Sequence, residues 1–166
     1  MKTGKQTAEV NIRWMIDRDI PEVLEIESHA PDFQWTEEVF RYHMRQRGVV
    51  CLVAEFGEKV VGFMVYALGS TTFGLFNIAV DPYWRRLKVG QQMIARLAGK
   101  LSKHRRTRIV MHAHEGNLDL HLFLRAMGFW CEGVEGEFYT MVRRIADGSE
   151  RPNRIAKYFE ARDADR

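Results

Sequence analysis

The stretch from Thr71 to Ser102 constrains the fold most strongly, because it predicts a strand, a basic turn and a helix in direct succession. Residues 71–80 are mostly β-branched, aromatic or apolar, and Asp81-Pro82 ends the predicted strand, since proline cannot donate to a sheet. Residues 89–102 carry apolar side chains at every fourth position, the spacing of an amphipathic helix. The turn between them contains Arg85, Arg86, Lys88 and Gly90.

This turn predicts a binding site for an anion. The first amides of a helix have no partner inside the helix, and the helix dipole adds partial positive charge at the same end. A pyrophosphate is the expected ligand, because helix N-termini commonly bind phosphate groups. The alternative is a solvated basic turn whose glycine serves packing alone. The residues expected to form the site are Arg85, Arg86, Leu87, Lys88, Val89, Gly90 and Gln91.

The rest of the chain predicts one sheet with flanking helices. Strands are expected at residues 11–16, 49–55, 60–68, 71–80, 108–113, 129–134 and 137–145, and helices at about 19–26, 36–47, 89–102 and 118–127. This order is typical of an α+β or mixed α/β sheet protein. Asp19 and Glu22 have the spacing of a capping box at the first helix. We expect a flexible leader at 1–10, one domain at 11–145 and a charged tail at 146–166.

Composition excludes several classes of function. A formal net charge of +3 is too small for the dense basic face of a nucleic-acid-binding protein. No apolar stretch approaches the ~18 residues of a membrane span, and the first ten residues lack the core of a signal peptide. Cys51 and Cys131 lack metal-site spacing and are expected to be buried, reduced thiols. We therefore expect a cytoplasmic monomer or homodimer without metal, membrane or nucleic-acid partner.

The basic turn resembles the cofactor-binding motif of the GNAT superfamily of N-acetyltransferases, whose pattern is Arg/Gln-x-x-Gly-x-Gly/Ala. Arg85 matches the first position and Gly90 the last. Lys88 stands at the first glycine of the pattern, where a lysine can adopt helical backbone angles and add charge. Asn117, before the predicted helix at 118–127, matches the asparagine that contacts the cofactor in this family; a simple helix cap is the alternative. The resemblance implies acetyl-CoA as the cofactor.

The GNAT fold implied by this resemblance has a mostly antiparallel central sheet. Its fourth and fifth strands are parallel and splay apart, and the pantetheine arm of the cofactor lies in the gap. Backbone groups of the fourth strand hold that arm as an added strand would be held. The residues at the corresponding positions are Ile78, Ala79 and Val80.

A further segment, Phe33-Gln34-Trp35-Thr36-Glu37, is similar to the Phe-Pro-Trp-Ser/Thr-Glu segment of the ribosomal-protein-alanine N-acetyltransferases (RimI type). In that type a glutamate of the fifth strand acts as the base, and His112 stands at its position. The resemblance implies that His112 takes the proton of the amine, a task suited to an imidazole near neutral pH. A packed strand histidine is the alternative, and His114 and Glu115 are nearby candidates for the base.

The general acid of the family has no counterpart in this chain. The family tyrosine follows the asparagine by seven positions, which is Leu124 here, and leucine has no proton to donate. Either no dedicated acid is needed, or Tyr139 or a water molecule serves.

We therefore expect an acetyl-CoA-dependent N-acetyltransferase whose acceptor is a protein N-terminal α-amino group, as on a ribosomal protein. Two alternatives stay open, because one fold supports many acceptors. The first is acetylation of a small-molecule amine or a lysine side chain. The second is an acyl-CoA-binding regulatory module with little catalysis, an interpretation that Leu124 favours.

Overall fold

The computed structural model describes residues 6–145, in which seven strands join into one sheet in the order β1-β2-β3-β4-β5-β7-β6. The strands are β1 (Asn11–Trp14), β2 (Val49–Phe56), β3 (Lys59–Leu68), β4 (Thr72–Val80), β5 (Arg108–His114), β6 (Trp130–Glu135) and β7 (Phe138–Arg144). Neighbouring strands are antiparallel except β4 and β5, which are parallel. The expected mixed sheet with a parallel fourth and fifth strand is confirmed.

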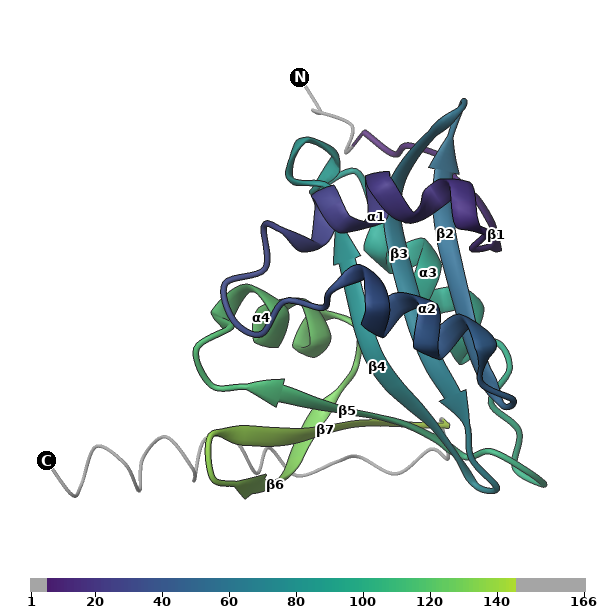
Figure 1. Ribbon diagram of the computed structural model, residues 1–166. Coiled ribbons are helices and arrows are strands. Elements are labelled where there is room, and N and C mark those ends of the chain that lie inside the picture. Colours follow the sequence, from purple (N-terminus) through teal and green to yellow (C-terminus); the bar gives the residue numbers. More distant parts are fainter. Residues whose placement is uncertain (1–5, 146–166) are drawn as a thin grey trace, which may run out of the picture.

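Helices cover both faces of this sheet (Figure 1). On one face lie α1 (Ile20–Glu27) and α2 (Glu37–Arg45), above a buried cluster that includes Phe40 and Phe63. On the other lie α3 (Val89–Ala98) and α4 (Leu118–Ala126), above a cluster that includes Leu97 and Leu124. Each fully buried side chain of this size contributes roughly 1.5–3 kcal/mol. The sheet is therefore packed on both faces.

The capping box predicted for α1 is not formed. The Asp19 carboxylate instead accepts two hydrogen bonds of 2.8 Å from Arg13 and one of 2.8 Å from the amide of Ile16. Glu22 accepts from the amide of Val60 at 3.1 Å, at the start of β3. Burial alone would raise the pKa of Asp19, but the hydrogen bonds outweigh it and hold that pKa below its ordinary value. Arg13 and the amides of Ile16 and Val60 thus bind the carboxylates that were expected to cap α1.

Other boundaries lie close to those predicted. The Thr36 hydroxyl caps α2, as expected. Helix α3 ends at Ala98, four residues early, because the chain tightens at Gly99 and the next amides bond to carbonyls three positions back. None of the helices within residues 6–145 is long and apolar enough to cross a membrane.

Part of the segment expected to be a flexible leader lies fixed against the domain. Ala8 is buried, and its amide donates to the carbonyl of Leu87 at 3.0 Å. The Gln92 side chain, in the first turn of α3, also bonds to the backbone of Ala8 and Val10. The leader therefore contacts both the basic turn and α3. The predicted charged tail at 146–166 lies outside the described residues, as do residues 1–5.

Candidate functional site

Strands β4 and β5 begin side by side and then separate (Figure 1). Their parallel pairing joins only residues 72–74 to residues 108–110. A bulge at Phe76 shifts the register of β4 against β3, and a bulge bends the strand that carries it. Within residues 6–145, the edge of β4 that faces β5 has no strand partner from Leu75 to Val80. Unpaired backbone groups on such an edge can bind an extended ligand as an added strand.

The basic turn follows the end of β4 and leads directly into α3. Arg86 and Lys88 both have a φ of 62°, and α3 begins at Val89. Backbone amides in turns of this kind form a concave site for an anion, and the helix N-terminus adds to it. Arg85, Arg86 and Lys88 are exposed. The geometry of the turn and its three cations therefore fit a pyrophosphate group.

Lys88 does not have ordinary helical backbone angles, and the expectation that it would is wrong. Its φ of 62° and ψ of 21° lie in the left-handed region. There the Cβ atom crowds the following carbonyl, which costs roughly 1–2 kcal/mol for a residue other than glycine. Glycine, the residue of the family pattern, would avoid that cost. Lys88 must therefore be held in this conformation by its surroundings.

Gly90 lies where α3 and α4 approach each other closely. A Cβ atom at this position would lie 2.9 and 3.0 Å from two ring atoms of Phe123, which is closer than carbon atoms pack. The glycine thus has a packing reason that is separate from any contact with a phosphate. It allows the ring of Phe123, in the second half of α4, to pack against the start of α3.

His112 faces the side of the sheet that carries α1 and α2. Its neighbours Met111 and Ala113 are buried beneath α3 and α4, so the strand alternation turns His112 and His114 the other way. His112 is exposed, and its Nδ1 lies 3.3 Å from Oγ1 of Thr140. If Nδ1 donates to that hydroxyl, Nε2 is left as an acceptor, which is the form that a base requires.

The connection between α1 and α2 reaches across the opening to β5 and β7. Phe33, which is 70% exposed, lies 5.7 Å from the ring of His114 and 6.3 Å from that of Phe138. Oε2 of Glu137 lies 3.4 Å from Nε2 of His114. The face on which His112 lies is therefore bordered by two aromatic rings and a carboxylate. The short turn between β6 and β7 places Phe138 at this border.

Helix α4 shows the outcome of two further expectations and one contact that was not expected. Asn117 caps it by accepting from the amide of Leu120 at 3.2 Å, so the cap is confirmed. Leu124 is fully buried in the core and has no proton to offer. The sequence did not single out His121, whose Nε2 donates to the carbonyl of His114 at 2.9 Å and whose ring lies 5.1 Å from that of Tyr139.

Glu27 is a buried carboxylate that no sequence motif singled out. It is 2% exposed, and its Oε1 accepts from the amide of Trp35 at 2.9 Å and from Nδ2 of Asn77 at 3.1 Å. Its Oε2 is buried without a hydrogen-bond partner among the described residues. Burial raises the pKa of Glu27, despite the two hydrogen bonds that lower it. Glu27 thus ties the α1–α2 connection to β4 just after the bulge.

Replacing Glu27 with glutamine is expected to remove a pH-dependent loss of stability. Above the ordinary glutamate pKa of 4.5, the folded chain keeps a proton that the unfolded chain has released. The free energy of unfolding of the wild type should therefore fall relative to Glu27→Gln as the pH rises above that value. Urea unfolding of both proteins between about pH 4 and 8 measures this. A difference that does not change with pH would contradict the assignment.

Replacing Glu27 with leucine removes the hydrogen-bond acceptor altogether. It leaves the amide of Trp35 and Nδ2 of Asn77 without their acceptor, and each buried unpaired donor costs about 1–3 kcal/mol. We expect a clear loss of stability at every pH in that range, measured in the same unfolding experiments.

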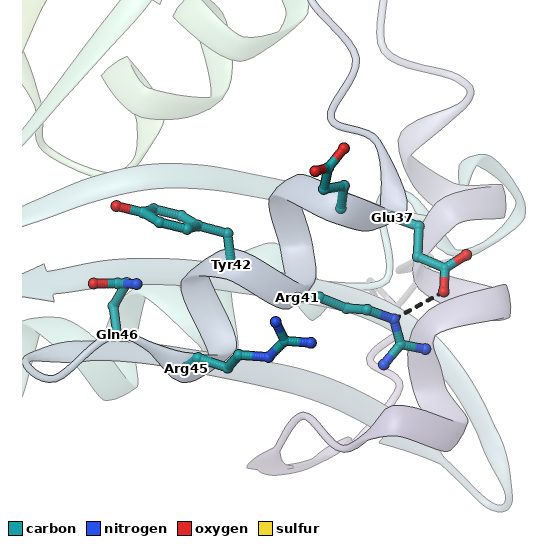
Figure 2. A pocket seen from close by; sticks show the side chains of 6 residues that line it. Glu37, Arg41, Tyr42, Arg45 and Gln46 are labelled. Carbon is teal, nitrogen blue, oxygen red and sulfur yellow. Dashed lines mark hydrogen bonds and ion pairs between the residues drawn. The ribbon is translucent and has the colours of Figure 1, made fainter.

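A shallow hollow of about 570 Å³ lies elsewhere, on the outer surface of α2 (Figure 2). Its lining residues are Glu37, Glu38, Arg41, Tyr42, Arg45 and Gln46. Arg41 forms ion pairs with Glu37 and Asp17, each at 2.8 Å. Oppositely charged side chains therefore neutralise one another there, and the hollow offers no group suited to the chemistry expected at the β4–β5 opening.

Comparisons with known proteins agree with this geometry. Residues 15–129 match the model of the Acetyltransferase (GNAT) family. The chain is 26% identical over 132 residues to the ribosomal protein bS18-alanine N-acetyltransferase of Escherichia coli strain K12, which covers 80% of this chain and 86% of that protein. Two solved structures have a similar fold. The PaiA N-acetyltransferase of Thermoplasma acidophilum in complex with coenzyme A has a TM-score of 0.73 at 14% identity, covering 82% of this chain and 99% of that one. The Escherichia coli ribosomal-protein-S18-alanine N-acetyltransferase has a TM-score of 0.66 at 18% identity, covering 86% and 100%.

Proposed function

Because the chain belongs to the acetyltransferase (GNAT) family and uses acetyl-CoA to acetylate an amine, we propose that its acceptor is the α-amino group at a protein N-terminus. The observation that carries the proposal is the exposed imidazole of His112 on the α1–α2 face, at the β4–β5 opening. Similarity to an enzyme named for acetylating an alanine of ribosomal protein bS18 supports it.

The chain offers two sets of groups for the cofactor, which supplies an activated acetyl thioester when it is bound. The cations of the basic turn and the first amides of α3 suit the pyrophosphate. The unpaired edge of β4 suits the pantetheine arm and can direct backbone amides at the acetyl carbonyl. The residues assigned to binding are Ile78, Ala79, Val80, Arg85, Arg86, Leu87, Lys88, Val89, Gly90, Gln91 and Asn117.

The proposed base is Nε2 of His112, with Thr140 holding the ring through Nδ1. An α-amino group has a reference pKa of about 8 and a lysine side chain one of about 10.4, a difference of about 3 kcal/mol in the cost of deprotonation. A neutral imidazole can therefore deprotonate an N-terminus far more readily than a lysine. This difference favours the α-amino group as the acceptor.

The leaving thiolate needs little help from the protein. A thiol has a reference pKa of about 8.5, so its anion is a fair leaving group near neutral pH. The buried Leu124 provides no acid, and water reaching the open side of the site can supply the proton. The chain can therefore complete the transfer without the tyrosine of the family.

The residues that border the face of His112 suit a positively charged peptide N-terminus. Glu137 brings negative charge beside His114, which raises the local concentration of an ammonium group. Phe33 and Phe138 provide apolar surface for the first side chain of the acceptor. We propose that the N-terminal residue lies against the exposed surface of these rings while its nitrogen faces His112.

The test uses a pair of peptides that differ only in the state of the N-terminus and at one internal position. One has a free alanine N-terminus and no lysine, and the other has a blocked N-terminus and one internal lysine; a polyamine is the third acceptor. Mass spectrometry after incubation with acetyl-CoA should find acetyl on the free N-terminus alone. Acetylation of only the lysine or the polyamine would contradict the acceptor. Binding of coenzyme A without turnover would favour the regulatory module.

A further inference from the structure

The start of the described chain is hydrogen-bonded to the basic turn. The amide of Ala8 donates to the carbonyl of Leu87 at 3.0 Å, and Leu87 lies between the two left-handed residues. Ala8 is 7% exposed, so this contact is shielded from water. The segment lies outside residues 15–129, the part of the chain that matches the family model.

Gln92 joins this segment to the first turn of α3. Its Nε2 donates to the carbonyl of Ala8 at 2.7 Å, and its Oε1 accepts from the amide of Val10 at 3.1 Å. The same Nε2 lies 3.2 Å from the carbonyl of Lys88. One amide side chain thus connects residues 8 and 10 to the residue whose backbone is strained.

The left-handed conformation of Lys88 needs interactions that stabilise it. A left-handed residue other than glycine persists only where the surrounding structure fixes it. The carbonyl of Lys88 is held by the amide and the side chain of Gln92, and the preceding carbonyl is held by Ala8. These hydrogen bonds hold the carbonyls of Leu87 and Lys88.

We propose that Gln92 and the backbone of residues 8–10 form a brace that holds the basic turn in its left-handed conformation. The brace thereby sets the affinity for coenzyme A. Gln92 is a positioning residue in this account, because it acts through Lys88. The brace offsets the cost of having lysine where the family pattern has glycine. It concerns the cofactor site alone and is independent of which amine accepts the acetyl group.

The test is a cycle of four full-length proteins: the wild type, Gln92→Ala, Lys88→Gly and the double variant. Calorimetric titration with coenzyme A gives the Kd of each. With Lys88 present, Gln92→Ala should raise the Kd by about tenfold; with glycine at 88, which tolerates positive φ, it should raise the Kd by about threefold or less. In Gln92→Ala, the KM for a peptide acceptor should stay within about twofold of the wild-type value.

The matched control is Arg96→Ala, one turn further along α3 on an exposed position. It should leave the Kd within about twofold, which excludes a general effect of alanine on the helix. An equal loss from Gln92→Ala in both backgrounds would overturn the proposal, because the contact would then act independently of the strained residue. No loss in either background would also overturn it.

A second pair of variants tests the brace from its other side. Ala8→Pro removes the amide that donates to Leu87, whereas Ala8→Gly keeps it. Ala8→Pro should raise the Kd for coenzyme A several-fold above that of Ala8→Gly. Equal Kd values for the two folded variants would contradict the brace.

Discussion

Replacing His112 with alanine is expected to lower kcat for a peptide acceptor by about 100-fold or more, the usual contribution of a general base. The Kd for coenzyme A should stay within about twofold, because the His112 side chain faces the α1–α2 side and the basic turn leads into α3 on the other. Single-turnover kinetics together with calorimetric titration separates the two effects. Imidazole added to the buffer should restore part of the lost rate in the alanine variant.

Two controls make this result specific to the base. Thr140→Val removes the hydroxyl beside Nδ1 and should lower kcat by only several-fold, since it alters the orientation of the ring and leaves the base in place. His114→Ala tests the neighbouring histidine, which contacts Phe33 and Phe138. If His114→Ala abolished turnover while His112→Ala did not, the base would be reassigned to His114.

Replacing Gly90 with valine is expected to weaken binding of coenzyme A by about tenfold or more and to lower the free energy of unfolding by about 1–3 kcal/mol. The new side chain would meet the ring of Phe123 and the side chain of Val80, so the start of α3 must shift. That shift would move the first amides of α3, which we propose to bind the pyrophosphate. Calorimetric titration and urea unfolding measure the two effects.

Gly99→Ala at the other end of α3 is the matched control. Its nearest contact would be the carbonyl of Ala95 at 3.3 Å, and we expect changes within about 0.5 kcal/mol and about twofold in Kd. Adding Phe123→Ala to Gly90→Val should restore part of the affinity by making room. Unchanged affinity in Gly90→Val would show that the close approach of the two helices does not position the cofactor site.

Most of the fold could be predicted from the sequence because its signals are local. The period of apolar residues located the helices and strands, and Asp81-Pro82 marked the end of β4. The parallel placement of β4 and β5 came from a resemblance carried by the basic turn. The capping box failed for a physical reason: Arg13 and Val60 bind the carboxylates that were expected to cap α1 locally.

Several features that escaped prediction depend on contacts between distant parts of the chain. Glu27 and Asn77 are separated by 50 positions, and Gln92 and Ala8 by 84. Glu27, Asn77 and Gln92 are polar residues with ordinary positions in their own elements, and no periodicity shows that they will form these contacts. The only sign of the left-handed conformation of Lys88 in the sequence is that a lysine stands where the family pattern has glycine. Whether its φ is positive or negative depends on the path of the whole turn.

The central claim, acetylation of protein N-termini, is tested most directly in the cells that make this protein. Mass spectrometry of cellular N-termini should be compared between cells with the wild-type gene, cells without it and cells carrying His112→Ala. The account predicts that a defined set of N-termini loses acetylation in the second and third cases. Unchanged N-termini, with acetylation lost instead from lysine side chains or small amines, would contradict it.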